Sequence, residues 1–197
     1  ASDTETEIAE PDSFFSLSHI GTLNAARNPK TLWKVLSELC SENSEFKSDL
    51  KIKLIGKTDF SVLEDIKTKQ LTQNLIKIDY VTHNEAIKLQ LSSQVLLLLI
   101  NNTENAKSIL TGKFFEYLGS KRPILAIGPT DGDVANVLKN TKSGLISDFN
   151  DEIQTRKIIM EFYSKYKKGI LQVDSEGVEL YSRKKLTNSL VKVINNL

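Results

Sequence analysis

The segment 111–117 combines residue types that suit the binding of a phosphate group. Thr111-Gly112-Lys113 stands at the expected start of a helix, where backbone N–H groups lack helical partners and the helix dipole is positive. Gly112 allows a ligand to approach the backbone closely, and Lys113 adds a positive charge at the same place. Glu116 follows on the same helical face, where its carboxylate could accept both hydroxyl groups of a ribose. The competing interpretation is a Lys113–Glu116 surface pair worth roughly a few tenths of a kcal/mol.

Two further loops lie where ligands could bind. In the loop 21–29, Gly21 permits a ligand to approach the backbone closely, and Arg27 or Lys30 could neutralise a diphosphate. Each of these basic side chains could equally be an ordinary solvated surface residue. The loop 128–133 is equally well explained as a turn followed by an aspartate that caps a helix. Neither the dinucleotide pattern G-x-G-x-x-G nor the P-loop pattern is present, so a standard dinucleotide dehydrogenase or a P-loop nucleotidase is not expected.

The sequence gives little support for a metal site or for a catalytic nucleophile. His19 falls inside a predicted strand and His83 in a loop, with no cysteine or carboxylate at ligand spacing. The only cysteine, Cys40, lies on the apolar stripe of a predicted helix and is interpreted as a core residue. The nucleophile pattern G-x-S-x-G is absent. We therefore expect no metal and no cofactor, and the sequence identifies no catalytic residue.

Alternating strands and helices must position these loops. Strands are predicted at 16–23, 50–55, 75–81, 95–100, 123–127 and 144–147. Helices are predicted from Pro29 through a stripe of Leu32, Val35, Leu36, Leu39 and Cys40, then at 61–69, from a cap at Asn84 to 92, at 111–118, 133–139 and 151–167, and finally over Leu186, Leu190, Val193, Ile194 and Leu197. The pattern predicts an α/β fold with a doubly wound, Rossmann-like parallel sheet covered by helices on both faces, whose ligands bind at the carboxyl ends of the strands.

The composition favours one soluble domain without nucleic acid or a membrane span. The chain has 197 residues, of which 40% are hydrophobic and 26% charged, and its formal net charge of +1 argues against a nucleic-acid partner. The longest apolar run, 95–100, has six residues, far fewer than the roughly 20 that span a bilayer. Residues 1–12 are polar and acidic, contain no secretory signal and are predicted to form a linker or tail. A single cysteine excludes an intrachain disulfide and favours a cytoplasmic location.

The run TGKFFEYLGSKRPILA at 111–126 resembles the donor-site helix and following strand of GT-B glycosyltransferases, most closely those of the group 1 or family 4 type. Other segments resemble parts of the carboxyl-terminal domain of that family in the same order: Ile20-Gly21-Thr22-Leu23, Leu54-Ile55-Gly56, Val81 to Ala86, Gly144-Leu145-Ile146 and Tyr181-Ser182-Arg183. The similarity extends over residues 16–197. The run from Lys113 to Pro123 is fairly specific to the family, whereas the other segments are individually weak.

The resemblance implies the nucleotide-sugar-binding half of an enzyme, with residues 1–15 as a linker or tail and residues 16–197 as a Rossmann-like domain. Glu116 would hold the donor ribose, the amides near Gly112 the diphosphate, and the backbone near Tyr80 and Val81 would lie along the base. The residues so implied for the donor nucleotide are Glu116, Lys113, Gly112, Thr111, Gly21, Arg27, Tyr80 and Val81. Ser108 and Asn102 are assigned to the donor-sugar side.

Two positions depart from the family pattern. Many members carry two glutamates separated by seven residues, and counting back from Glu116 places Ser108 at the first of them. Many also have an arginine directly after the glycine of the first loop, where this chain has Thr22. Another cation, such as Arg27, would then have to serve the phosphates.

The implied function is transfer of a sugar from a UDP- or GDP-linked nucleotide diphosphate sugar to an acceptor held by a missing N-terminal domain. The chain alone would be inactive, and the full enzyme could make a peripheral contact with a membrane. Two alternatives remain open. One is a non-catalytic α/β interaction module with an apolar surface for a partner. The other is a fragment of a GT-B sugar-nucleotide epimerase, for which the two histidines supply few acid and base groups.

Overall fold

A computed structural model describes residues 10–173, 176–181, 185, 187 and 191. The apolar positions of the expected last helix, Leu186, Leu190, Val193, Ile194 and Leu197, lie outside these described residues, as do Ser182 and Arg183. No helix within the described part is long and apolar enough to cross a bilayer.

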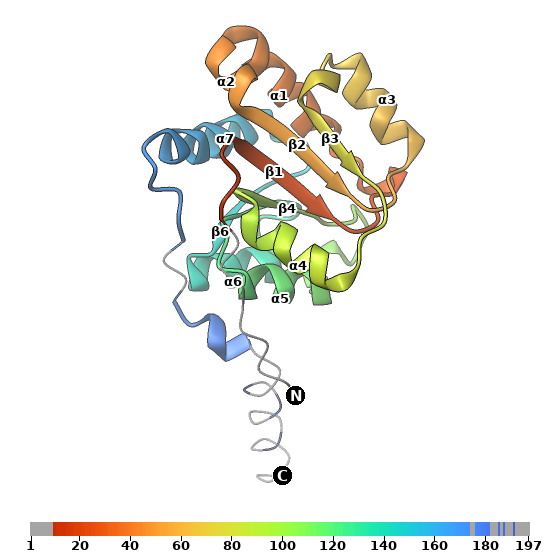
Figure 1. Ribbon diagram of the computed structural model, residues 1–197. Coiled ribbons are helices and arrows are strands. Elements are labelled where there is room, and N and C mark those ends of the chain that lie inside the picture. The colour runs from red at the N-terminus through yellow and green to blue at the C-terminus, as the bar shows by residue number, and fades with distance from the viewer. Residues whose placement is uncertain (1–9, 174–175, 182–184, 186, 188–190, 192–197) are drawn as a thin grey trace.

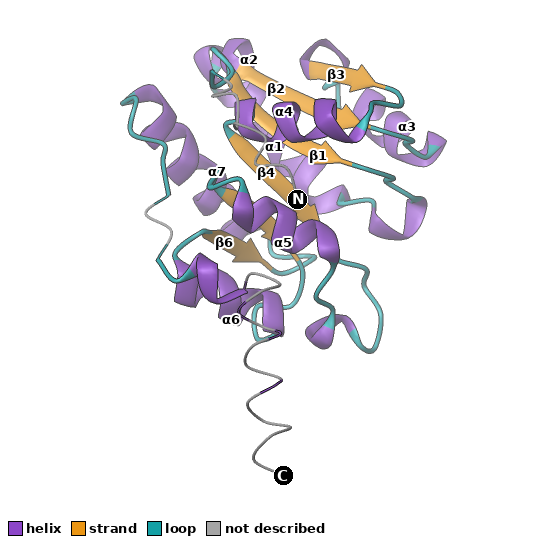
Figure 2. Ribbon diagram, turned by 60° about the horizontal axis from the view of Figure 1, so that its bottom comes forward, coloured by secondary structure: helices purple, strands orange, loops and turns teal. Residues whose placement is uncertain are grey.

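A six-stranded parallel sheet forms the centre of the molecule, as predicted. Its strands are β1 (Phe15–Ile20), β2 (Leu50–Ile55), β3 (Leu75–Ile78), β4 (Val95–Leu99), β5 (Ile124–Ile127) and β6 (Gly144–Ser147). They pair in the order β3-β2-β1-β4-β5-β6, and Figure 2 shows their arrows running in the same direction. The order reverses between β1 and β4, so the loops that follow these two strands diverge and leave room for a ligand.

Helices cover both faces of this sheet, which confirms the predicted fold class. They are α1 (Lys30–Glu42), α2 (Ser44–Asp49), α3 (Phe60–Thr68), α4 (His83–Ser92), α5 (Gly112–Gly119), α6 (Asp133–Thr141) and α7 (Glu152–Lys167), with short 3-10 turns at Ala25–Arg27, Thr72–Asn74, Ala106–Ser108 and Val178–Tyr181. In Figure 1, α1, α2, α3 and α7 lie above the sheet and α4, α5 and α6 below it. The chain therefore crosses to the second face after β3 and returns to the first face after β6.

Two apolar cores result from this layering. Leu17 of β1 faces the core beneath α1 and α7, whereas Ile20 faces the core beneath α5 and α6. The predicted stripe of α1 is buried in the first core, including Cys40, which confirms its interpretation as a core residue. Both faces of the central strands β1 and β4 are covered, which explains why 95–100 is apolar without interruption.

The region around α4 differs from the sequence prediction. β3 ends at Ile78 rather than at residue 81, and α4 is capped by Thr82 rather than by Asn84, which lies inside the helix. The Thr82 side chain accepts from the Glu85 N–H at 3.3 Å, and the Glu85 carboxylate accepts from the Thr82 N–H at 2.8 Å. This reciprocal pair satisfies two backbone donors at once, which a cap at Asn84 would not do.

A buried ion pair fixes the chain where it enters the sheet. Lys53, in the middle of β2, is only 4% exposed, and its Nζ lies 2.8 Å from Asp12 Oδ2. The Asp12 N–H donates to the Ser92 carbonyl at 2.7 Å, and the Asp12 carbonyl accepts from the Gln94 side chain at 2.6 Å. Asp12, from the stretch expected to be a linker, is thus held by side-chain and backbone contacts together.

We predict that Asp12→Asn lowers the free energy of unfolding by about 3 kcal/mol, because it leaves the Lys53 ammonium buried without a counter-charge. Urea denaturation at pH 7 measures this difference. Asp148→Asn, which changes an exposed aspartate after β6, should alter the free energy by less than about 0.5 kcal/mol. Combining Asp12→Asn with Lys53→Met should recover much of the loss, and a double mutant no more stable than Asp12→Asn would contradict this account.

Candidate functional site

Two glycine turns lie side by side at the carboxyl ends of β1 and β2. Gly21 and Gly56 have φ angles of +116° and +109°, which L side chains rarely adopt. A Cβ added to Gly56 would lie 2.9 Å from the Gly21 carbonyl oxygen, and the Gly21 N–H donates to the Ile55 carbonyl at 2.7 Å. Both positions therefore require glycine. The two adjacent turns, at Gly21 and Gly56, are called the glycine crest below, and they lie at the carboxyl ends of β1 and β2.

Lys113 reaches from the first turn of α5 to this crest. A Cβ added to Gly21 would lie 2.6 Å from Lys113 Nζ, so the ammonium group occupies the space beside the Gly21 backbone. Thr111 caps the helix by accepting from the Phe114 N–H at 3.3 Å. The buried Tyr117 hydroxyl accepts from the Ile20 N–H at 3.0 Å and joins α5 to the end of β1. The structure thus brings together Gly21 and Lys113, which are far apart in the sequence.

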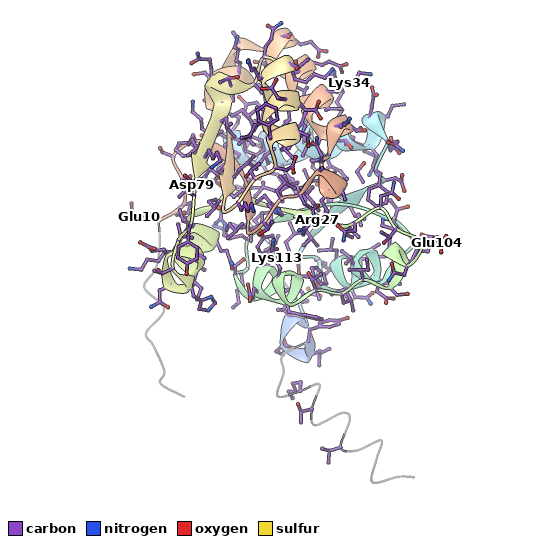
Figure 3. The ribbon with its side chains drawn as sticks, turned by 90° about the vertical axis from the view of Figure 1, so that its right-hand side faces the viewer. Glu10, Arg27, Lys34, Asp79, Glu104 and Lys113 are labelled. Carbon is purple, nitrogen blue, oxygen red and sulfur yellow. The ribbon has the colours of Figure 1, made fainter. Side chains whose placement is uncertain are left out.

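Arg27 supplies a second positive charge near Lys113, and Figure 3 labels both side chains in this part of the molecule. Its Nη2 donates to the Thr22 carbonyl at 2.8 Å, and its Nε is buried without a hydrogen-bond partner in the described part of the chain. Burial and, to a smaller extent, the charge of Arg27 together lower the pKa of Lys113 to about 8, although Glu116 opposes the change. No carboxylate in the described part of the chain forms an ion pair with Lys113 or Arg27. The pair therefore favours an anionic ligand.

His19 lies beneath these two cations and is 1% exposed. Its Nδ1 is 3.1 Å from the Leu97 carbonyl oxygen, so this nitrogen carries the proton in the neutral ring, and Nε2 has no hydrogen-bond partner among the described residues. Burial lowers the pKa of His19 to about 3, with further contributions from the charges of Lys113 and Arg27. A neutral ring at this position avoids a third positive charge beside Lys113 and Arg27. Within the described residues, no group of three or more His, Cys, Asp or Glu side chains could hold a metal ion.

A cavity of about 510 Å³ adjoins the crest and extends across β2 to β3. Its apolar lining comes from Ile20, Ile55, Val81 and Ala86, and its polar rim includes Lys57, Thr58, Lys77 and Asp79. Tyr80 stands at this rim and is 91% exposed, so its ring is free to contact a ligand. The predicted base-side residues Tyr80 and Val81 therefore share one cavity with Gly21.

The remaining predicted residues lie around this centre. Arg27 and Thr111 line a smaller cavity of about 50 Å³ together with Asn101, whose buried Oδ1 has no partner. Glu116 is exposed and lines a groove between α4 and α5 with His83. Gly112 is exposed at the start of α5, and Asn102 and Ser108 are exposed in the loop after β4 and line none of these three cavities.

The loop 128–133 packs against the loop that follows β4 and leads into α5. A Cβ added to Gly132 would lie 2.7 Å from the Lys107 carbonyl oxygen, and Lys107 Nζ lies 2.6 Å from Asp131 Oδ2. The predicted aspartate cap is wrong, because Gly132 is the N-cap of α6 and Asp133 is its first residue. A glycine is needed there because the loop after β4 packs directly against it.

Sequence reasoning missed several residues of the site. Gly56, Lys57, Lys77 and Asp79 line the large cavity but were not predicted to bind a ligand. The available indication was Gly56 directly after a predicted strand, where it matches Gly21 after the strand before it. The charged residues at 77 and 79 gave no comparable indication, since their positions depend on where β3 ends.

Comparison with known proteins supports the fold. No family model matches the sequence, and no curated protein matches it. The N-terminal domain of trehalose-6-phosphate phosphatase from Candida albicans matches with a TM-score of 0.67 and 12% identity, over 95% of this chain and 42% of that one. The UDP-forming α,α-trehalose-phosphate synthase from Burkholderia vietnamiensis matches with a TM-score of 0.64 and 9% identity, over 93% and 45% of the two chains.

WaaG, a glycosyltransferase involved in lipopolysaccharide biosynthesis, matches with a TM-score of 0.57 and 10% identity, over 78% of this chain and 40% of WaaG. This chain thus spans less than half the length of each of these proteins. At such low identities the similarity shows a glycosyltransferase-like fold, and the function must be argued from the site.

We predict that Lys113→Met stabilises the protein, because it removes a charge that the folded state disfavours. In the folded state the pKa of Lys113, about 8, lies below the ordinary lysine value of 10.5, so the penalty is fully present below pH 8 and disappears as the pH rises toward 10.5. At pH 7 the substitution should raise the free energy of unfolding by about 1 to 3 kcal/mol, measured by urea denaturation. The matched change Lys139→Met, at an exposed position of α6, should have little effect. A loss of stability on Lys113→Met would contradict the assignment of an unpaired cation.

Proposed function

We propose that this chain is the donor-binding half of a glycosyltransferase of the GT-B class, of the group 1 or family 4 type. It would bind a UDP- or GDP-linked nucleotide diphosphate sugar in the cytoplasm, while a second domain holds the acceptor. The observation that carries this proposal is the pair of cations, Lys113 and Arg27, beside the glycine crest, for which the described residues supply no ion-pairing carboxylate. An interaction scaffold would have no use for this costly arrangement.

The crest suits a diphosphate for three reasons. Gly21 leaves room for the Lys113 ammonium beside its backbone, Lys113 and Arg27 provide charge, and the first amides of α5 at Gly112 provide hydrogen-bond donors. During transfer of the sugar, the leaving diphosphate gains negative charge at this position. Cations fixed in advance would stabilise that charge, and the reaction would need no proton from this half of the enzyme.

The nucleoside would extend from the crest into the large cavity. Val81 and the neighbouring apolar side chains provide a floor for the base, and the exposed ring of Tyr80 provides a face for stacking. Glu116, one turn along α5 from Lys113, would accept the ribose hydroxyls from the groove between α4 and α5. Asn102 and Ser108, in the exposed loop after β4, would lie toward the sugar.

The length of the structural neighbours supports a missing partner domain. Each neighbour is more than twice as long as the part matched by this chain. A domain preceding this one would then hold the acceptor and supply any base that activates it, with the residues before β1 as the connection. The epimerase alternative is weaker because it needs titrating groups near the sugar, and His19 is buried and neutral.

We predict that the chain binds UDP or GDP, and that Lys113→Ala or Arg27→Ala weakens the binding of both and of pyrophosphate by roughly ten- to a hundredfold, the range for loss of a charge-assisted hydrogen bond. Isothermal titration calorimetry measures these affinities. Glu116→Ala should weaken the nucleoside diphosphate much more than pyrophosphate, because the carboxylate contacts only ribose. Lys139→Ala serves as the control for lost charge. A wild-type chain that binds no nucleoside diphosphate below millimolar concentration would instead favour the interaction module.

We predict that the affinity for the nucleoside diphosphate falls about tenfold between pH 7 and pH 9, because the free Lys113 loses its proton as the pH rises through about 8. Lys113→Arg should abolish most of this decline, since a guanidinium stays charged throughout the range. Titrations at pH 7, 8 and 9 with both proteins provide the test. A wild-type affinity independent of pH would show that Lys113 does not contact the diphosphate.

A further inference from the structure

The outer rim of the large cavity carries an ion pair that the diphosphate site does not use. Lys77 and Asp79 both line the cavity and pair with each other. They stand two residues apart on an extended segment, a spacing that directs both side chains to the same side. Figure 3 labels Asp79 at the end of β3, away from Arg27 and Lys113. Asp79 is 86% exposed in its side chain, so its carboxylate oxygens are accessible to a ligand.

The strand order places this pair at the far end of a bound nucleoside. β3 is separated from β1 by β2 alone, so its end lies two strand spacings, roughly 10 Å, from the Gly21 turn. This is about the span of a nucleoside from its phosphate to the outer edge of its base. A nucleotide held by its diphosphate at Gly21 and extended through the cavity would present that outer edge to Lys77 and Asp79.

The chemistry of the pair matches one base better than the others. Lys77 offers donors only, and the Asp79 carboxylate offers two acceptors. Guanine presents an acceptor at O6 followed by donors at N1 and N2, which is the complementary order. Uracil presents an acceptor, a donor and an acceptor, so its O2 would face a carboxylate oxygen. Cytosine and adenine each present a single donor group on this edge, the exocyclic amine, so one oxygen of the Asp79 carboxylate would have no donor to accept from.

We propose that this site selects a guanosine diphosphate donor, with Lys77 and Asp79 reading the outer edge of the base. The proposal rests on the proposed function, which leaves the base open between uracil and guanine. Tyr80, which directly follows Asp79 and lines the same cavity, adds an exposed stacking face that suits the larger purine ring. Lys77 would not have to break its ion pair with Asp79 to bind guanine, because the same ammonium group could also donate a hydrogen bond to O6.

Competition titrations of the whole chain with GDP, UDP and inosine diphosphate test the proposal. GDP should bind at least about tenfold more tightly than UDP, in line with the discrimination of a bidentate base contact. Inosine diphosphate, which lacks the N2 amino group, should bind less tightly than GDP. Asp79→Asn should weaken GDP by about tenfold and remove the difference between GDP and inosine diphosphate, while pyrophosphate binding stays unchanged. Asp148→Asn is the matched control and should change none of these affinities.

The outcomes separate this proposal from the one on which it rests. UDP binding as tightly as GDP, or Asp79→Asn weakening UDP and GDP equally, would overturn guanine selection and leave the donor-binding function intact. Failure of every nucleoside diphosphate to bind would overturn the donor-binding function itself. Circular dichroism of Asp79→Asn verifies that the exposed substitution leaves the fold unchanged. Lys77→Met provides a second variant, which removes the donor to O6 and should weaken GDP while leaving pyrophosphate binding unchanged.

Discussion

The contact between the Lys113 ammonium and the Gly21 backbone is the constraint on which the site depends. It exists only because Gly21 has no side chain and adopts a positive φ, and because Gly56 packs against it in the same way. The contact also needs α5 to be held at a fixed distance from β1, and the hydrogen bond from the Ile20 N–H to the Tyr117 hydroxyl provides this. Burial raises the pKa of this hydroxyl above its usual value, so it stays protonated and neutral beside the cations. The sheet, the helix and the two turns therefore act together to place one charge.

This placement has an electrostatic cost that the charged side chains between α1 and α7 avoid. Between α1 and α7, Arg156 pairs with Glu38 and Glu42, and Lys34 pairs with Glu152. At the crest, by contrast, the charges of Arg27 and Lys113 depress the pKa of neighbouring groups rather than meeting carboxylates. Groups that weaken the folded state in this way are characteristic of binding sites, where the ligand supplies the missing counter-charge.

The sequence predicted the elements well because their patterns are local. The apolar run 95–100 and the apolar stripe of α1 can each be recognised from the residues of that segment alone, and both are buried in the structure. Spatial proximity was harder to predict, since the meeting of Gly21 and Lys113 depends on β1 and β4 being neighbours, which alternation of strands and helices does not specify. The cap of α4 was misplaced because threonine and asparagine are both good caps, and the choice depended on the reciprocal bond with Glu85. Short α2 was missed because six residues are too few to show a helical period.

The fold itself is compatible with more than one activity, as its similarity to a phosphatase N-terminal domain and to glycosyltransferases illustrates. The contacts around Thr22 are more informative than the fold, because they explain why threonine stands at this position. The resemblance to the glycosyltransferase family leads one to expect an arginine at this position, yet Arg27 bonds the Thr22 carbonyl and Lys113 already lies against Gly21. A third cation at residue 22 would add repulsion to a partly buried pair and lower the pKa of Lys113 further. Threonine is therefore the residue that lets two cations from other elements share this place, and the departure from the family pattern is compensated by the geometry around it.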